Sequence, residues 1–175
     1  RTTRSQAYAQ SLAAADFNLK SVVLFGDCAP PPAIDWAAQE GAESPVFLPD
    51  LTIPLEQTCL RQGWEMRDLE TRDVNEPQIA ATLDNLAPKL VIYSGYGGQI
   101  VGADLIAKPY KILHMHPGWL PDYRGSTTIY YSWLAEGECA VSAFYMAEGI
   151  DTGEIVWREK YPLPPGGINV NHVYD

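Results

Sequence analysis

The sequence predicts an α/β domain with a doubly wound, mainly parallel sheet. Short apolar runs, among them SVVLF at 21–25 and LVIY at 90–93, alternate with segments whose apolar residues recur at helical spacing. Strands that alternate with helices form right-handed βαβ units, in which neighbouring strands are parallel. Stretches rich in glycine and polar residues follow two of the apolar runs, which is where such a sheet binds its ligand.

The N-terminal half shows both helical and strand patterns. An alanine-rich stretch in which Tyr8 and Leu12 are four residues apart predicts the first helix, and Ile79 and Leu83 show the same spacing in a later one. Gly63 is a typical end for the helix before it. We expect helices over 4–15, 55–62 and 76–86 and strands over 21–25, 64–69 and 90–93, while 33–40 carries helix formers and 44–48 is a short apolar run bounded by prolines.

The C-terminal half continues the alternation and then adds two strands in succession. The run KILHMH at 111–116 is expected beside the strand at 90–93, because a short helical segment connects them. The runs CAVSAFYM and EIVWREKY are typical of further strands. The remaining expected elements are helices over 101–106 and 127–136 and strands over 111–116, 139–146 and 154–161.

The length of 175 residues fits a single domain over 1–175, of which 162–175 would begin a distal segment. A sheet of this type normally opens with a central strand before its first helix. Here the helical pattern already starts near Arg4. We therefore expect the domain to be N-terminally incomplete, with its first strand preceding Arg1.

Composition narrows the class of protein. Lys and Arg number 12 against 22 Asp and Glu, so the net charge of −10 opposes binding to phosphate backbones and anionic lipid. Without a dense cluster of basic residues we expect no nucleic-acid partner, and without a long apolar run we expect no membrane span. Cys28, Cys59 and Cys139 are widely spaced and odd in number, which favours a reducing, cytoplasmic setting over a disulfide framework or zinc knuckle.

Two histidines mark the end of the strand at 111–116. Because side chains two apart in a strand share a face, His114 and His116 should project together. Two imidazoles on one face can act as an acid–base pair or supply half of a metal site. The loop that follows, PGWLPDYRG at 117–125, is held by two prolines and two glycines at a position where function concentrates.

The sequence resembles the catalytic domain of the folate-dependent formyltransferases. The resemblance rests on HPGWLPDYRG at 116–125 and EGIDTGEI at 148–155, which occur in the family's order and spacing between about Leu90 and Val156. The segment GYGGQI at 95–100 is similar to one wall of the family's folate pocket, with an extra glycine. Before Leu90 the sequence is similar to the family only in the layout of its helices and strands. The resemblance implies a Rossmann-like, formyltransferase-like fold.

The resemblance also implies an activity, the transfer of a formyl group from 10-formyltetrahydrofolate to a primary amine. The family uses an Asn, a His and an Asp for this reaction. The His corresponds to His116 and the Asp to Asp151, whereas the Asn position is occupied by His114. The sequence thus departs from the family at one catalytic position.

The chemistry explains why these residue types are needed. Attack of an amine on a formamide carbon makes a tetrahedral centre with a negative oxygen, to which a protonated His116 can donate. Asp151 can orient His116 and favour its charged form. His114 can donate as an Asn would, but its ring also titrates, its titration is coupled to that of His116, and it could take the proton of the amine.

Other residues receive roles from the same resemblance. The family's folate pocket and the loop on its acceptor side correspond to short segments of this sequence. Cofactor-binding residues are expected to be Tyr96, Gly97, Gly98, Gln99, Ala147, Glu148, Gly149, Ile150 and Asp151, and the acceptor-side loop to contain Pro117, Gly118, Tyr123, Arg124 and Gly125. The expected acceptor is a small molecule, an amino sugar or another metabolite amine.

Three alternatives remain open. Water could replace the amine, which would make the protein a formyltetrahydrofolate hydrolase. His114, His116 and Asp151 could instead form the two-histidine, one-carboxylate site of a metal-dependent hydrolase. The replacement of Asn by His could also leave a non-catalytic folate-binding domain.

Overall fold

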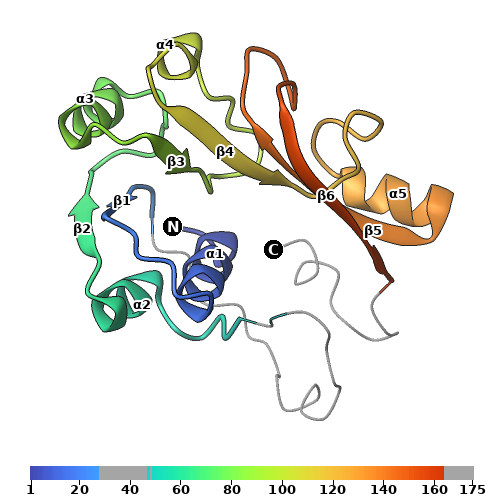
Figure 1. The fold of residues 1–175 in the computed structure, drawn as a ribbon, viewed down its shortest axis with the longest axis horizontal. Coiled ribbons are helices and arrows are strands. Elements are labelled where there is room, and N and C mark those ends of the chain that lie inside the picture. The colour runs from blue at the N-terminus through green and yellow to red at the C-terminus, as the bar shows by residue number, and fades with distance from the viewer. Residues whose placement is uncertain (28–46, 48, 164–175) are drawn as a thin grey trace. The chain divides into compact units, whose positions relative to one another are not determined.

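The computed structural model describes residues 1–27, 47 and 49–163. The chain divides into two compact units, Arg1–Asp73 and Val74–Asp175, which we describe separately (Figure 1). The expectations for 33–40 and 44–48 lie outside the described residues, apart from Phe47. No helix in the described ranges is long and apolar enough to span a membrane.

The first unit is built on a pair of parallel strands. Thr2 caps the first helix by accepting from the Ser5 amide, and Gly63 ends the second helix in the left-handed conformation, at φ +69°. A core of Ala9, Leu24, Leu55, Cys59 and Trp64 lies between these elements. In chain order the elements are α1 (Thr3–Ala14), β1 (Ser21–Leu24), α2 (Leu55–Gln62) and β2 (Glu65–Asp68).

The second unit contains a four-stranded sheet with the order β3-β4-β5-β6. Figure 1 shows these strands side by side. The pair β3–β4 is parallel, whereas β4–β5 and β5–β6 are antiparallel. In chain order the elements are α3 (Pro77–Leu86), β3 (Leu90–Ile92), α4 (Ala103–Ile106), β4 (Lys111–His116), α5 (Thr128–Glu136), β5 (Glu138–Tyr145) and β6 (Ile155–Pro162).

The α/β class is confirmed, and every element expected within the described residues is present, with ends within two residues of those expected. The sheet of the second unit is less parallel than expected, because β5 and β6 run antiparallel to their neighbours. Only residues 146–154 connect β5 to β6. A parallel pair needs a crossover of about a dozen residues or more, so this connection permits only a hairpin.

The centre of the sheet is tightly packed. Phe144 of β5 is 1% exposed and Ser142 of the same strand is fully buried. Leu120, from the loop after β4, is also 1% exposed. The loop that carries the HPGWLPDYRG motif beyond His116 is therefore anchored by its own buried side chain.

Candidate functional site

His116, the last residue of β4, is buried between a loop and a carboxylate. Its side chain is 4% exposed. Its Nε2 lies 2.7 Å from the carbonyl oxygen of Tyr123, and since a carbonyl only accepts, Nε2 carries the proton of this bond. Its Nδ1 lies 3.4 Å from Oδ2 of Asp151. Both ring nitrogens thus face oxygen acceptors, an arrangement that the protonated ring satisfies completely.

Asp151 reaches this position from the hairpin between β5 and β6. Its Oδ2 accepts a hydrogen bond of 2.7 Å from the Gly125 amide, in addition to facing His116. Its backbone has a φ of +49°. A Cβ on Gly153, at φ +131°, would come within 2.0 Å of the Tyr145 carbonyl oxygen, so only glycine fits there. The D-T-G sequence thus builds the turn that aims the carboxylate at His116.

Ser142 of β5 holds the loop after β4 through two hydrogen bonds. The Ser142 hydroxyl donates to the Gly118 carbonyl at 2.6 Å and accepts from the Leu120 amide at 3.0 Å. A Cβ on Gly118 would lie 2.9 Å from Nε2 of His116 and 3.0 Å from the Tyr123 oxygen. The loop can therefore close on the imidazole only because residue 118 has no side chain.

The far end of the loop is tied to α5 and β6. The Tyr123 hydroxyl donates to Glu136 at 2.8 Å. Lys160 donates to the same carboxylate at 2.8 Å and to Glu138 at 2.7 Å. The hydrogen bond from Lys160 is the largest cause that lowers the pKa of Glu136, and the hydrogen bond from Tyr123 lowers this pKa further. The residue whose carbonyl holds His116 is thereby fixed by its own side chain.

Arg158 of β6 provides another tie to this loop. Its guanidinium lies 4.2 Å from the centre of the Trp119 ring and donates to the Leu120 carbonyl at 2.5 Å. The Lys160 ammonium lies 5.4 Å from the same ring. Trp119 thus packs against two cations of β6.

His114 lies on the same strand but has different neighbours. Its Nδ1 is 3.1 Å from the Tyr93 carbonyl oxygen, so Nδ1 is the donor. Its ring is 5.8 Å from that of Tyr93 and meets the Phe144 ring edge-on at 5.9 Å. When the ring is neutral and Nδ1 carries the proton, Nε2 is the acceptor. The contacts that define His114 thus differ from those of His116.

The glycine-rich segment after β3 begins beside the strand that carries both histidines. Ile92 of β3 pairs with Leu113 of β4, so the carboxyl ends of the two parallel strands are adjacent, as expected. The Gln99 amide donates to the Tyr96 carbonyl at 3.3 Å, and Gly98 between them has a φ of +83°. The segment is therefore a tight turn that needs glycine at position 98.

Apart from His114, which has the separate contacts given above, the expected residues fall into two groups. Hydrogen bonds and close contacts join His116, Asp151, Gly118, Tyr123 and Gly125. The residues of the other group are half-buried or exposed: Tyr96, Gly97, Gly98, Gln99, Pro117, Arg124, Ala147, Glu148, Gly149 and Ile150.

Four residues around this site were not anticipated from the sequence: Ser142, Thr128, Glu136 and Lys160. The Thr128 hydroxyl donates to the Pro117 carbonyl at 3.0 Å and lies 3.4 Å from Nε2 of His116. The one local signal was Ser142, a polar residue inside the apolar run CAVSAFYM. Glu136 and Lys160 gave no signal, because charged residues near element ends are ordinary.

The described ranges contain no group of three His, Cys, Asp or Glu side chains that could hold a metal ion. Nδ1 of His114 faces the Tyr93 carbonyl, and Nε2 of His116 faces the Tyr123 carbonyl. The metal-dependent hydrolase that the H-x-H pattern allowed therefore has no ligand cluster in this part of the chain.

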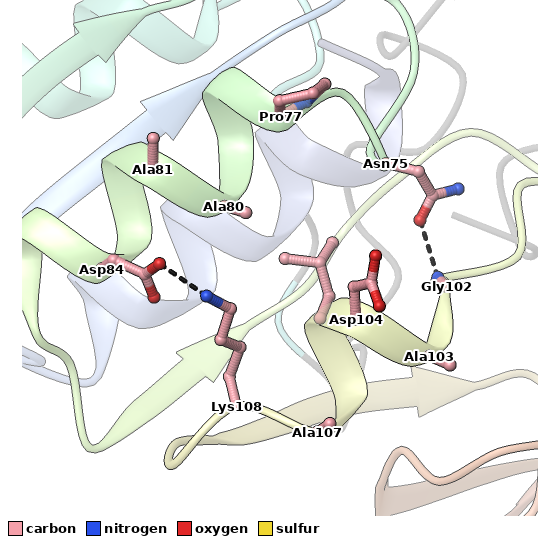
Figure 2. A pocket seen from close by; sticks show the side chains of 11 residues that line it. Asn75, Pro77, Ala80, Ala81, Asp84, Gly102, Ala103, Asp104, Ala107 and Lys108 are labelled. Atoms are coloured by element: carbon pink, nitrogen blue, oxygen red, sulfur yellow. Dashed lines mark hydrogen bonds and ion pairs between the residues drawn. The ribbon is translucent and has the colours of Figure 1, made fainter.

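A separate groove of about 790 Å³ lies between α3 and α4 (Figure 2). Alanine side chains of both helices line it, and an ion pair of 2.5 Å between Asp84 and Lys108 crosses it. At its other end the Asn75 side chain holds Gly102. The groove thus borders the connection that leads from the glycine-rich segment into α4.

The sequence profile described as formyl transferase matches residues 3–173 of the chain. The chain belongs to this family. Two curated methionyl-tRNA formyltransferases illustrate the relationship. The protein of Syntrophus aciditrophicus (strain SB) is 31% identical over 104 residues, which are 59% of this chain and 33% of the relative. That of Anaeromyxobacter dehalogenans (strain 2CP-C) is 36% identical over 98 residues, which are 54% of this chain and 31% of the relative.

The chain spans about a third of the length of these curated formyltransferases. Solved structures of the family share its fold. Phosphoribosylglycinamide formyltransferase from Streptococcus pneumoniae TIGR4 superposes with a TM-score of 0.63 at 20% identity, over 93% of this chain and 81% of that one. Glycinamide ribonucleotide transformylase 1 from Symbiobacterium toebii gives 0.61 at 19% identity, over 94% and 70%. The Rossmann-like, formyltransferase-like fold is confirmed.

The family resemblance expected from the motifs is therefore confirmed. Formyltransferases are enzymes that transfer a formyl group to an amine, and the family uses 10-formyltetrahydrofolate as the donor. Within that family, His114 occupies the position that we matched to an Asn, and the conformation of His116 is set by a backbone carbonyl and a carboxylate.

Proposed function

We propose that this formyltransferase transfers the formyl group of 10-formyltetrahydrofolate to the primary amine of a small acceptor. The observation that carries the proposal is the pairing of His116 with Asp151 at 3.4 Å at the carboxyl end of β4. A buried imidazole held by a carboxylate, next to a glycine-rich turn, suits a reaction that develops negative charge on oxygen.

In the reaction the amine nitrogen forms a bond to the formyl carbon, and the bond from that carbon to the folate nitrogen breaks. The amine loses a proton and the folate nitrogen gains one. The Nε2 proton of His116, which is donated to the neutral Tyr123 carbonyl, would transfer its hydrogen bond to the formyl oxygen as that oxygen becomes negative. Asp151 would stabilise the imidazolium throughout.

His114 is proposed to act on the amine. With Nδ1 donating to the Tyr93 carbonyl, Nε2 of the neutral ring is a proton acceptor, which the amide of an Asn is not. The replacement of Asn by His would then add a base to the site while keeping a side chain that can donate hydrogen bonds.

The proposed folate site lies between the turn after β3 and the hairpin after β5. Gly97 and Gly98 are exposed, and no atom lies within 4 Å of where a Cβ would be on either. Residues Ala147 to Ile150 are also exposed. Exposed backbone on both sides fits a flat ring with hydrogen-bonding edges, so these residues are compatible with the pterin end of a reduced folate.

The acceptor is proposed to be a small amine, such as an amino sugar, because the net charge of −10 opposes non-specific binding to RNA. The second candidate is an aminoacylated tRNA. It is favoured by the curated relatives, which are methionyl-tRNA formyltransferases. The buried free thiols of Cys59 and Cys139 support a reducing, cytoplasmic setting for the reaction.

The test combines binding and turnover. Calorimetry with 5-formyltetrahydrofolate, a non-transferring analogue, should show binding, and loss of 10-formyltetrahydrofolate should depend on an added amino sugar or other small amine. Formate release without an amine would identify a hydrolase instead. Formylation of initiator methionyl-tRNA, with affinity falling steeply as salt rises, would replace the small acceptor by tRNA. Absence of folate binding at millimolar concentrations would overturn the proposal.

A further inference from the structure

Asn75, which lies just before α3, holds a distant piece of backbone with both ends of its side-chain amide. Its Nδ2 donates to the Ile100 carbonyl at 2.9 Å, and its Oδ1 accepts from the Gly102 amide at 2.6 Å. Figure 2 shows the second bond at the end of the groove between α3 and α4. One side chain thus brackets two residues that are 25 and 27 positions away.

The bracketed backbone is the end of the segment that is proposed to form one wall of the folate site. Ile100 is the last residue of GYGGQI, and Gly102 is the N-cap residue of α4. Val101 between them is 7% exposed and belongs to the core. The end of the segment is therefore held on both sides, by Val101 inside and by Asn75 outside.

The hydrogen bond between Asn75 and Gly102 requires the Asn75 side chain to approach Gly102 closely. A Cβ on that residue would lie 2.9 Å from Oδ1 of Asn75, so the contact depends on glycine at position 102. The start of the same segment is fixed independently, because the Tyr93 amide donates to the Leu113 carbonyl at 2.9 Å. Between these anchors the chain contains Gly95, Gly97 and Gly98, so its conformation depends on where its two ends are held.

We infer that Asn75 is a positioning residue for reduced-folate binding, acting through the backbone of Ile100 and Gly102. The inference rests on the proposed function, since it concerns a residue that holds one wall of the proposed folate site. Asn75 does not touch the folate in this account. It sets the distance between the glycine-rich turn and the strand ends against which the folate would lie.

The experiment measures the Kd of 5-formyltetrahydrofolate by calorimetry for the wild type and three variants. Loss of both hydrogen bonds in Asn75→Ala should raise Kd about fivefold. Asn75→Asp keeps an acceptor for the Gly102 amide but loses the donor to Ile100, so its Kd should lie between the two. Asn85→Ala, an exposed asparagine on α3, is the matched control and should bind as the wild type does.

A positioning role is separated from a general loss of structure by kinetics. With any accepted amine, Asn75→Ala should raise the KM for 10-formyltetrahydrofolate and leave kcat and the KM for the amine within about twofold. A lowered kcat with an unchanged folate KM would overturn the inference. If Asn75→Ala does not fold, Asn75→Asp decides, and an unchanged Kd in that variant would also overturn it. Absence of binding by the wild type would refute the proposed function and, with it, this inference.

Discussion

The Nε2 atom of His116 donates to the backbone oxygen of Tyr123 at 2.7 Å, while the Tyr123 hydroxyl donates to Glu136 at 2.8 Å. A single residue thus connects the buried imidazole to the surface carboxylate. Because Lys160 also binds Glu136, the position of the loop depends on a charge pair between α5 and β6.

Replacement of His116 or Asp151 should abolish most turnover. We expect His116→Ala and Asp151→Asn each to lower kcat by about 10²–10³-fold, since the first removes the donor to the oxyanion and the second removes the carboxylate that favours the charged form of that donor. The double variant should be little worse than the poorer single variant, because the two side chains act as a unit. Asp104→Asn, an exposed carboxylate on α4, is the control for the charge change. Near wild-type turnover in His116→Ala, with a normal melting curve, would refute the catalytic assignment.

Gly118→Ala should disturb the closure of the loop on His116. The new Cβ would meet Nε2 of His116 at 2.9 Å and the Tyr123 oxygen at 3.0 Å, so the loop must shift and the bond between them must lengthen. We expect a loss of about 1–3 kcal/mol in the free energy of unfolding and a larger proportional loss of kcat. Urea titration and steady-state kinetics measure the two effects. Gly97→Ala, where nothing lies within 4 Å, should leave the free energy of unfolding unchanged.

The Glu136–Lys160 pair should stabilise the protein only above acidic pH. The pKa of Glu136 is lowered by bonds from Lys160 and Tyr123, so its contribution is present above the ordinary value of 4.5 and is lost as pH falls through the lower, folded value. The pKa of Lys160 is raised by Glu136 and Glu138, so its contribution persists through neutral pH and is lost only above the ordinary value of 10.5.

The corresponding experiment compares the urea unfolding of the wild type and Lys160→Met across pH. The difference between them should be largest near neutral pH and should shrink as the pH falls below 4.5 and through the lowered, folded pKa of Glu136. Lys89→Met, another exposed lysine of the second unit, is the control and should show a smaller difference at neutral pH. A difference that does not change with pH would mean that Lys160 acts through packing on Trp119 alone.

His114→Asn should show whether the replacement of the family's Asn by His changes catalysis. If His114 accepts the proton of the amine, the variant should turn over more slowly and should lose one limb of the pH profile of kcat. The measurement is kcat against pH with a confirmed acceptor. An unchanged rate and an unchanged profile would mean that His114 only donates a hydrogen bond, as the bond to Tyr93 already shows it can.

Helices and strands could be predicted because the signals that define them are local. Gly63 ends α2 in the left-handed conformation, and α3 follows the spacing of Ile79 and Leu83. The direction of β6 was harder to predict from the sheet type. It follows from the length of the connection at 146–154, which is too short for a crossover.

The sequence by itself determined the family, through the order of the His116 and Asp151 motifs, and the neighbourhood of the strands at 90–93 and 111–116. Only the tertiary structure decided which atoms meet. That Ser142 holds the loop, that the Tyr123 carbonyl faces His116 and that Asn75 brackets Ile100 and Gly102 depend on residues 7 to 27 positions apart. Such contacts arise from strand register and turn geometry. No periodicity in the sequence encodes them, because each involves one side chain and one distant backbone group.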